Sequence, residues 1–299
     1  ERVHSLFQSK NYAEARFSLC LRNYWCRGLI DESLCKSWTT LNDFKIALRW
    51  VNSYKTEWVD REGFPLLGYA SSTDCTELVR EVLSKISEIS DEAIRISYVC
   101  TRFPGGVLSL GITAGMTPLM IAVIASKSEI VSLLLGQGAD PMETDISGLD
   151  VLQFATAFGR TDNVKFWLDK FPDWDLERKN KVVGGVALGQ AVYMGPYRLE
   201  LVKILLNRGA RIDTETHRGG TALAALCKCE DGSSDVLCEL INRMKTTLHV
   251  NQINHRRQAR TLKWRIIYRL ARLLTRYKPT NSGLMTALAQ DSGSTALHY

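Results

Sequence analysis

Cysteine and histidine side chains in the C-terminal third of the chain have the chemistry to hold a metal ion. Cys227 and Cys229 are separated by one residue, Cys238 follows them, and His217 precedes them. Structural zinc sites use pairs of cysteines separated by at least two residues, and that spacing is missing here. We therefore expect reduced cysteines with structural roles and no bound metal.

A glycine cluster is the next candidate for chemistry. Gly184, Gly185 and Gly189 follow the apolar pair Val182 and Val183, as glycines do at the entrance to a phosphate-binding loop. Such loops need the order G-x-G-x-x-G, or a lysine followed by serine or threonine, and neither is present. The cluster therefore does not predict a nucleotide site.

No catalytic constellation is visible in the rest of the chain. The five histidines are dispersed, and neither the H-E-x-x-H motif nor the G-x-S-x-G motif occurs. We expect a protein that is not an enzyme and that binds no cofactor.

The strongest chemical signal is a concentration of positive charge. Residues 240–290 contain 11 Lys or Arg and no Asp or Glu, so the net charge of +6 conceals a remainder of −5 (27 basic against 32 acidic). Within 255–278 apolar residues and arginines each recur at helical spacing, which predicts a basic amphipathic helix. Its apolar face would hold Leu262, Ile266, Leu270, Leu273 and Tyr277, and its basic face Arg265, Arg269, Arg272 and Arg276.

Three functions fit such a helix: a calmodulin target, an anchor for an anionic membrane surface, or a site for a phosphate-rich partner. The alternative is an ordinary structural helix whose apolar face is packed and whose arginines are solvated, and its position in the chain favours that alternative. No specific nucleic acid is expected. The residues that would carry binding are Trp264, Arg265, Arg269, Arg272, Leu273 and Arg276.

The elements that position these residues follow from a repeat of 33 residues. Gly115, Leu119 and Ala122 recur as Gly148, Leu152 and Ala155, and the apolar run 133–135 recurs as 166–168. With Thr117-Pro118-Leu119-x-x-Ala122 inside it, this pattern resembles the ankyrin repeat. The resemblance implies an all-α solenoid of stacked helix-turn-helix units with short β-hairpin fingers between them.

Each position of the repeat has a physical role. Gly115 suits a turn with positive φ, Thr117 can cap the first helix, and Pro118 suits its first turn. Ala122 must be small where neighbouring helices approach closely. Gly138 is placed to end the second helix.

The repeat pattern divides the chain into four parts. Residues 1–58 are predicted to form an N-terminal helical cap or degenerate repeats. Ankyrin repeats are expected over 59–245, starting near 60, 112, 145, 181 and 216, with an insertion near 88–111 that should form a long finger or loop. Residues 246–290 are expected to hold the basic helix or an atypical repeat, and 291–299 to open a truncated further repeat.

The ankyrin resemblance also implies a function. Such arrays bind partner proteins on the concave surface of fingers and first helices, which predicts a non-catalytic scaffold or adaptor. The alternative is the regulatory cytosolic region of a larger enzyme or ion channel. Mapping the binding positions of the family onto this chain gives Met116, Ile124, Ile146, Leu149, Phe158, Tyr193, Met194, His217 and Arg218.

The location predicted from the sequence is the cytoplasm or the nucleus. No signal peptide is visible at the start, and the uncharged stretch 103–126 is interrupted by glycine and proline and follows the repeat register, so we do not expect it to span a membrane. Because the chain begins without methionine and ends in the opening of another repeat, we expect a fragment of a longer protein.

Overall fold

A computed structural model describes residues 66–72, 76–105, 113–125, 128–193, 198–227, 234–246, 255–277, 288, 290–291 and 293–295. The segment 1–58, for which a helical cap or degenerate repeats were predicted, lies outside these residues. The chain forms two compact units, Glu1–Ile146 and Ser147–Tyr299, which we call unit 1 and unit 2.

Unit 1 is built from helix pairs. Helices α5 (Leu66–Ser71) and α6 (Thr76–Ser87) form one pair, and α8 (Pro118–Ala125) and α9 (Ser128–Gly136) form the next. Helix α5 packs on α8, and α6 packs on α9, so the two pairs are stacked. All eight residues of α8 are buried, because its sequence is apolar on every side.

The turn and cap residues of this repeat lie where the sequence predicts them. Gly115 has φ +81°, and the Thr117 hydroxyl accepts a hydrogen bond from the Met120 N–H at 3.4 Å. At the end of α9, Gly138 has φ +87°, and the Ala139 N–H donates to the Leu134 carbonyl at 3.1 Å. Both helix ends therefore satisfy backbone groups that a bare end would leave unpaired.

The insertion near 88–111, for which a long finger or loop was expected, contains a helix, and Phe103 after it closes a finger with Gly115 and Met116. Helix α7 (Glu92–Val99) is capped by Asp91, whose carboxylate accepts from the N–H groups of Ala93 and Ile94 at 2.9 and 3.2 Å. Helix α7 packs on α6. The helix was not predicted, although an acidic cap followed by apolar residues at helical spacing is itself a helix signal.

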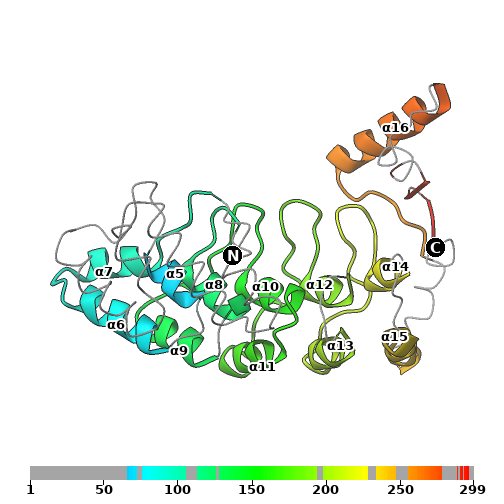
Figure 1. Cartoon of the computed structure of the whole chain (residues 1–299). Coiled ribbons are helices and arrows are strands. Elements are labelled where there is room, and N and C mark those ends of the chain that lie inside the picture. Colours follow the sequence, from blue (N-terminus) through cyan, green and yellow to red (C-terminus); the bar gives the residue numbers. More distant parts are fainter. Residues whose placement is uncertain are drawn as a thin grey trace, which may run out of the picture. The chain divides into compact units, whose positions relative to one another are not determined.

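Unit 2 also consists of helix pairs, and three are described. These are α10 (Val151–Ala157) with α11 (Thr161–Lys170), α12 (Ala187–Tyr193) with α13 (Arg198–Asn207), and α14 (Ala222–Leu226) with α15 (Ser234–Thr246). Helix α12 packs on both α10 and α14, and α13 packs on both α11 and α15, which gives two layers (Figure 1). Ala155 and Ala191 are fully buried on the first layer, as the close approach of neighbouring helices requires.

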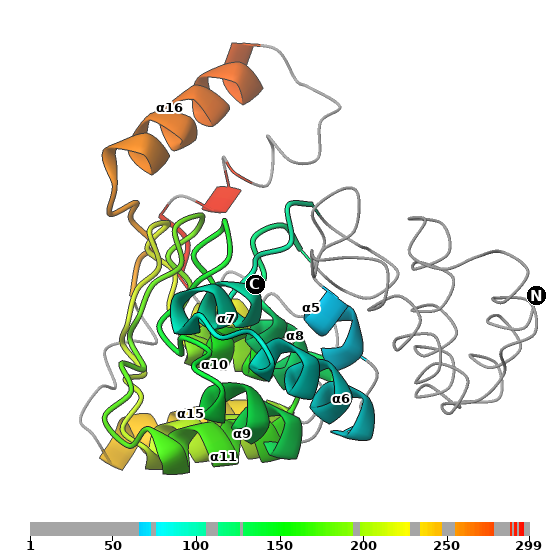
Figure 2. The same cartoon turned by 90° about the vertical axis from the view of Figure 1, so that its left-hand side faces the viewer.

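The loops that join successive helix pairs, which we call fingers, rise from one side of the helices of unit 2 (Figure 2). Asn180 closes one finger: its N–H donates to the Gly185 carbonyl at 3.0 Å, and its carbonyl accepts from the Gly184 N–H at 3.1 Å. Thr216 closes the next in the same way with Gly220 and Gly219, at 2.9 Å each. The fingers are thus hairpin turns, and no strand is assigned among the residues that the structure describes.

The same pair of backbone hydrogen bonds, which we call the closure of a finger, occurs a third time in unit 2, across a much longer loop. The Arg257 N–H donates to the Ser294 carbonyl at 2.9 Å, and the Arg257 carbonyl accepts from the Gly293 N–H at 2.8 Å. Helix α16 (Leu262–Tyr277) lies between these closing residues. The basic helix is therefore an insertion at the tip of a finger, and we call the whole segment 257–294 the expanded finger.

Candidate protein-binding site

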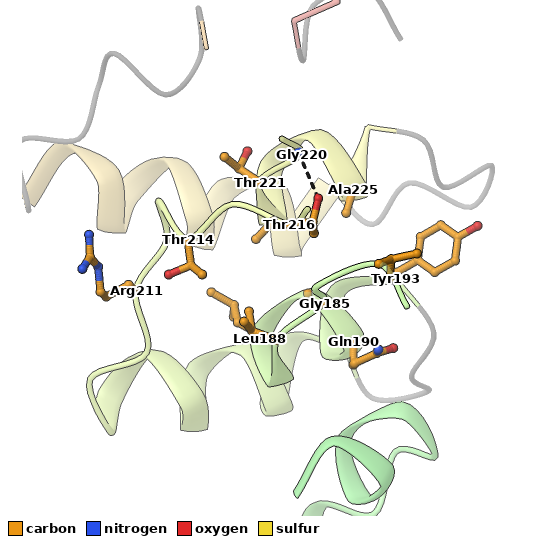
Figure 3. Close-up of a pocket in the computed structure, with 14 residues that line it drawn as sticks. Gly185, Leu188, Gln190, Tyr193, Arg211, Thr214, Thr216, Gly220, Thr221 and Ala225 are labelled. Atoms are coloured by element: carbon orange, nitrogen blue, oxygen red, sulfur yellow. Dashed lines mark hydrogen bonds between the residues drawn. The ribbon is translucent and has the colours of Figure 1, made fainter. Parts of the chain in front are cut away.

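A pocket of about 240 Å³ lies between two fingers and two first-layer helices of unit 2. Tyr193 and Arg211 lie on opposite sides of the pocket, with Leu188 between them (Figure 3). The lining from the 180–185 finger and α12 is Val183, Gly185, Val186, Leu188, Gly189, Gln190 and Tyr193. The lining from the 216–220 finger and α14 is Arg211, Thr214, Thr216, Gly220, Thr221, Ala222 and Ala225.

Glycine residues at the pocket leave room between the helices and let the two fingers lie close together. Gly189 lies on α12, and a Cβ built there would meet no heavy atom within 4 Å. Gly184 has φ +70°, and a Cβ there would lie 2.7 Å from the His217 backbone nitrogen, so the fingers approach each other more closely than any other residue would allow. The His217 N–H donates to the Val183 carbonyl at 2.8 Å and joins the two fingers.

Three polar side chains at the pocket, those of Thr216, Thr214 and Arg211, are bonded within the protein. The Thr216 hydroxyl accepts from the Gly220 N–H at 3.1 Å, and the Thr214 hydroxyl donates to the Glu177 carboxylate. Arg211 pairs with Asp213 at 3.1 Å, and this hydrogen bond raises the pKa of the guanidinium. The lining offers apolar surface with satisfied polar neighbours, which suits an apolar side chain better than an ion.

Two of the predicted contact residues are buried and cannot face a partner. Met116 is fully buried in unit 1, where its carbonyl accepts from the Phe103 N–H at 2.9 Å to close a finger. Ile124 is 3% exposed because every side of α8 is covered. The predictions were wrong here because family positions do not show which side chains this chain packs inward.

The other predicted contact residues differ in exposure. In unit 1, Ile146 is 69% exposed. In unit 2, Phe158 and Tyr193 are 44% and 55% exposed, whereas Leu149, His217 and Arg218 are half-buried. Tyr193 is the predicted residue that lines the pocket, and Met194 lies outside the described residues.

Sequence reasoning did not single out Gly189, Gln190, Thr214, Thr216 or Ala225 as site residues. The signal that could have found them is the small residues on the first helices, since Gly189 leaves open space that a larger residue would fill and Ala225 lines the same pocket.

Arg218 has an internal role. Its guanidinium pairs with the Asp291 carboxylate at 2.5 Å, donates to the Tyr268 hydroxyl at 3.3 Å, and lies 5.0 Å from the centre of the Trp264 ring. Asp291 is 3% exposed and also pairs with Arg257 at 2.9 Å. Two arginines therefore share one buried carboxylate, which fixes α16 to the tip of the 216–220 finger.

The face of α16 that was predicted to be apolar is exposed, whereas a structural helix would bury it, and a different face is packed. Leu262, Ile266, Leu270 and Leu273 are 48–66% exposed, so the predicted apolar face is not buried in the stack. The packed side is instead Tyr268 and Ala271 against Leu288, with Trp264 and Ile267 partly buried beside them. Arg265, Arg269, Arg272 and Arg276 are exposed, as a basic face requires.

The described residues contain no group of three His, Cys, Asp or Glu that could hold a metal ion. Cys227 is half-buried and Cys238 is exposed, both as free thiols, and Cys229 lies outside the described residues. In the same part of the chain, no helix has both the length and the hydropathy to cross a membrane.

Comparison with known proteins places the repeat in a family. The ankyrin repeat model matches residues 114–146, which contain α8 and α9. Phosphocholine transferase AnkX of Legionella pneumophila subsp. pneumophila is 29% identical over 136 residues. That match covers 44% of this chain and 14% of AnkX, so the chain spans a small part of that relative. The chain therefore contains an ankyrin repeat at residues 114–146, and its all-helical architecture agrees with that family.

Proposed function

We propose that the chain is a non-catalytic protein-interaction module, a scaffold or adaptor, that binds a partner protein on the surface of its fingers and first helices. The observation that carries this proposal is the apolar pocket of unit 2, with Tyr193 exposed at its edge. Ankyrin repeats generally act by binding proteins, and an apolar pocket with a neighbouring aromatic residue suits a side-chain anchor.

The partner in this proposal inserts one large apolar side chain between the two fingers. Thr214 and Thr216 are committed to Glu177 and Gly220, so they add shape and do not select for a charged group. Tyr193 would cover the inserted side chain. Exposed Ile146 and Phe158 are further contact candidates on their own units.

A pocket-filling variant tests this proposal. Peptides selected from a displayed random library against the 299-residue chain should share an apolar anchor residue. Gly189→Leu should weaken their binding at least about tenfold, because its side chain enters open space in the pocket. Gly136→Leu is the matched control, because a Cβ there also meets nothing within 4 Å and the residue lies on α9 of unit 1. Equal binding by both variants would show that the pocket is not the site.

A second candidate function is that of a regulatory region in a larger enzyme or channel. The observation that favours it is the similarity to a part of a protein named as a transferase, of which the match covers 14%. Determining the complete reading frame around residues 1–299 tests it. A catalytic or channel domain in the same reading frame would support this function. A reading frame that encodes repeats alone would rule it out.

The proposal includes a second binding element and a location. Helix α16, within residues 255–278, would bind either calmodulin or an anionic membrane surface. The protein would act in the cytoplasm or nucleus, which imaging of a fluorescent fusion to the full protein would test.

A further inference from the structure

We infer that α16 docks flat on an anionic lipid surface, with its exposed apolar row in the interface and its arginines on the lipid headgroups. The inference rests on the proposed binding role of α16 and is independent of the pocket in unit 2. It commits to one of the two partners named for this helix and makes the other an outcome of the test.

Three faces can be distinguished on α16. The packed face consists of Trp264, Ile267, Tyr268 and Ala271, which lie toward Leu288. Beside it runs a row of apolar residues that are 47–66% exposed, which we call the leucine row: Leu262, Ile266, Leu270, Leu273 and Leu274. On the other side of the leucine row lies the arginine row: Arg265, Arg269, Arg272 and Arg276.

The leucine row is unusual because it is both apolar and continuous. Its members follow each other at intervals of three or four residues, apart from the neighbours Leu273 and Leu274, so they lie along one side of the helix. Single exposed leucines are ordinary, but five in one row form a contiguous patch of the kind that marks a contact surface.

The positive charges of α16 indicate that its partner is negatively charged. Its five basic residues, Lys263 and the arginine row, have no ion pair with any residue that the structure describes. The arginines before the helix differ, since Arg257 pairs with Asp291 and Arg260 pairs with Glu215. No acidic residue occurs in 240–290, so this surface is complementary to an anionic one.

The packing of α16 favours a lipid surface over calmodulin. Calmodulin encloses the large apolar anchors of its target helix, and here those anchors would include the aromatic side chains of Trp264 and Tyr268. Tyr268 is 2% exposed, and Trp264 lies against Arg218. A membrane needs only one free face of the helix, and the leucine row supplies it without removing either aromatic side chain from its packing.

The length of α16 fits a helix that lies in the interface. Its 16 residues extend about 24 Å at 1.5 Å per residue, which is short of the roughly 20 residues needed to span a bilayer. Interfacial helices of this kind combine apolar burial with attraction between basic side chains and anionic lipids.

The test measures flotation of the full 299-residue chain with two kinds of vesicle. One is phosphatidylcholine alone, and the other contains phosphatidylserine at about one lipid in three. We expect binding to the anionic vesicles only, weakening as the salt concentration rises. Arg269→Gln with Arg272→Gln should lower the partition coefficient about 25-fold, at about fivefold for each charge. Leu270→Ser with Leu273→Ser should lower it at least about tenfold.

Matched controls separate these effects from misfolding and from general charge. Lys170→Gln with Lys203→Gln removes two exposed charges from α11 and α13, and Val182→Ser removes an exposed apolar residue from a finger. Both controls should bind vesicles like the parent chain. All substituted side chains are exposed, so thermal melting followed by circular dichroism should be unchanged in every variant.

Three results would overturn the inference. They are no binding to anionic vesicles, equal binding of the double-serine variant, and capture by calcium-loaded calmodulin in the absence of vesicle binding. None of these results bears on peptide binding in the pocket, and loss of peptide binding in Gly189→Leu does not bear on the vesicles. Failure of one proposal is therefore distinguishable from failure of the other.

Discussion

The 216–220 finger and the expanded finger of unit 2 are closed by the same pair of backbone hydrogen bonds, but the segments between the bonded residues differ greatly in length. Thr216 exchanges two backbone hydrogen bonds with Gly219 and Gly220, across two intervening residues. Arg257 exchanges the same two bonds with Gly293 and Ser294, across 35 residues from 258 to 292 that include a 16-residue helix. Gly219 and Gly293 both have positive φ, at +77° and +85°.

The closure therefore does not depend on the size of the tip. The glycine turns the chain into the next helix, and the residue before the loop supplies the two hydrogen bonds, whatever lies between them. The entropic cost of a flexible loop rises by only about 0.6 kcal/mol for each doubling of its length. A finger tip is thus a place where a chain can gain a functional element without disturbing the helix layers.

The two fingers differ in how their tips are held. The tip of the 216–220 finger is held by its neighbours on both sides through the backbone: the His217 N–H donates to the Val183 carbonyl, and the His217 carbonyl accepts from the Arg260 N–H. The expanded finger depends on side chains: the Asp291 carboxylate binds Arg218 and Arg257, and Arg260 pairs with Glu215. A larger tip needs these additional contacts because its backbone closure fixes only its base.

The largest expected effect is the removal of Asp291. Asp291→Ala should destabilise the closure of the expanded finger by about 3–5 kcal/mol, since it leaves the buried Arg257 without a counter-charge. Hydrogen exchange should accelerate over 255–277 and stay unchanged over α12. Glu200→Ala, which removes a surface partner of Lys165, should have a much smaller effect on stability, because exposed ion pairs are screened by solvent. Equal effects of the two changes would mean that side chains do not hold the expanded finger.

The second effect compares the two turn glycines. A Cβ at Gly219 would lie 2.1 Å from the Gln258 carbonyl oxygen, whereas a Cβ at Gly293 would meet nothing within 4 Å. Gly219→Ala should therefore cost about 3 kcal/mol, from backbone strain and overpacking together, and Gly293→Ala about 1–2 kcal/mol from strain alone. Urea unfolding of both variants measures the difference. If Gly293→Ala is the more harmful, the closeness of Gln258 is not what demands glycine at 219.

The third effect concerns the residue two positions after the turn glycine, which caps the next helix. Thr221 caps α14, but Asp150 occupies this position before α10, where it accepts from the Gln153 N–H at 2.8 Å. Burial raises the pKa of Asp150 to about 6 from 3.8, although the Gln153 hydrogen bond and Arg178 oppose the shift. The charged form is thus held at a cost that a neutral cap avoids.

The sign of the pH dependence follows from this raised pKa. Between pH 3.8 and about 6 the folded chain keeps a proton that the unfolded chain has released, so the contribution of Asp150 falls as pH rises and is constant above that range. Relative to the parent, Asp150→Asn should gain up to about 3 kcal/mol in unfolding free energy between pH 4 and 7. Urea titrations at several pH values check this, and a pH-independent difference between the two proteins would rule it out.

The smallest expected effect is the replacement of residues 259–290 by a short Gly-Ser linker. The unfolding free energy of the layers α10–α15 should change by about 1 kcal/mol or less, because loop length enters only logarithmically. Vesicle binding should be lost while peptide binding in the pocket persists. A collapse of the layers in this variant would show that the expanded finger supports the stack.

The repeat itself could be predicted from the sequence, because its signals are local. Gly115, Thr117, Pro118 and Gly138 each act on neighbouring backbone groups, and the structure places each in its expected role. The pairing of Arg257 with Gly293 and Ser294 could not be predicted, because the two sides of that finger are more than 30 residues apart and their types carry no pairing code.

The amphipathic helix could be predicted, but the side that packs could not. The apolar residues of α16 cover two adjoining faces, and periodicity does not show which one meets Leu288. For the same reason the burial of Ile124 was missed, since α8 is apolar on all sides and lacks a direction. The pocket depends on the distance between two fingers, which is a property of the stack and not of any one repeat.

The expanded finger also has a consequence for the order of folding. The bonds of Thr216 join residues three and four apart, so the 216–220 finger can form as soon as its own segment is ordered. The bonds of Arg257 join residues 36 and 37 apart, and such non-local contacts form more slowly because a larger segment must first be brought together. Helix α16 would then spend the interval before closure attached at one end only, with its leucine row and its aromatic side both uncovered, which makes this finger the step of folding most exposed to aggregation.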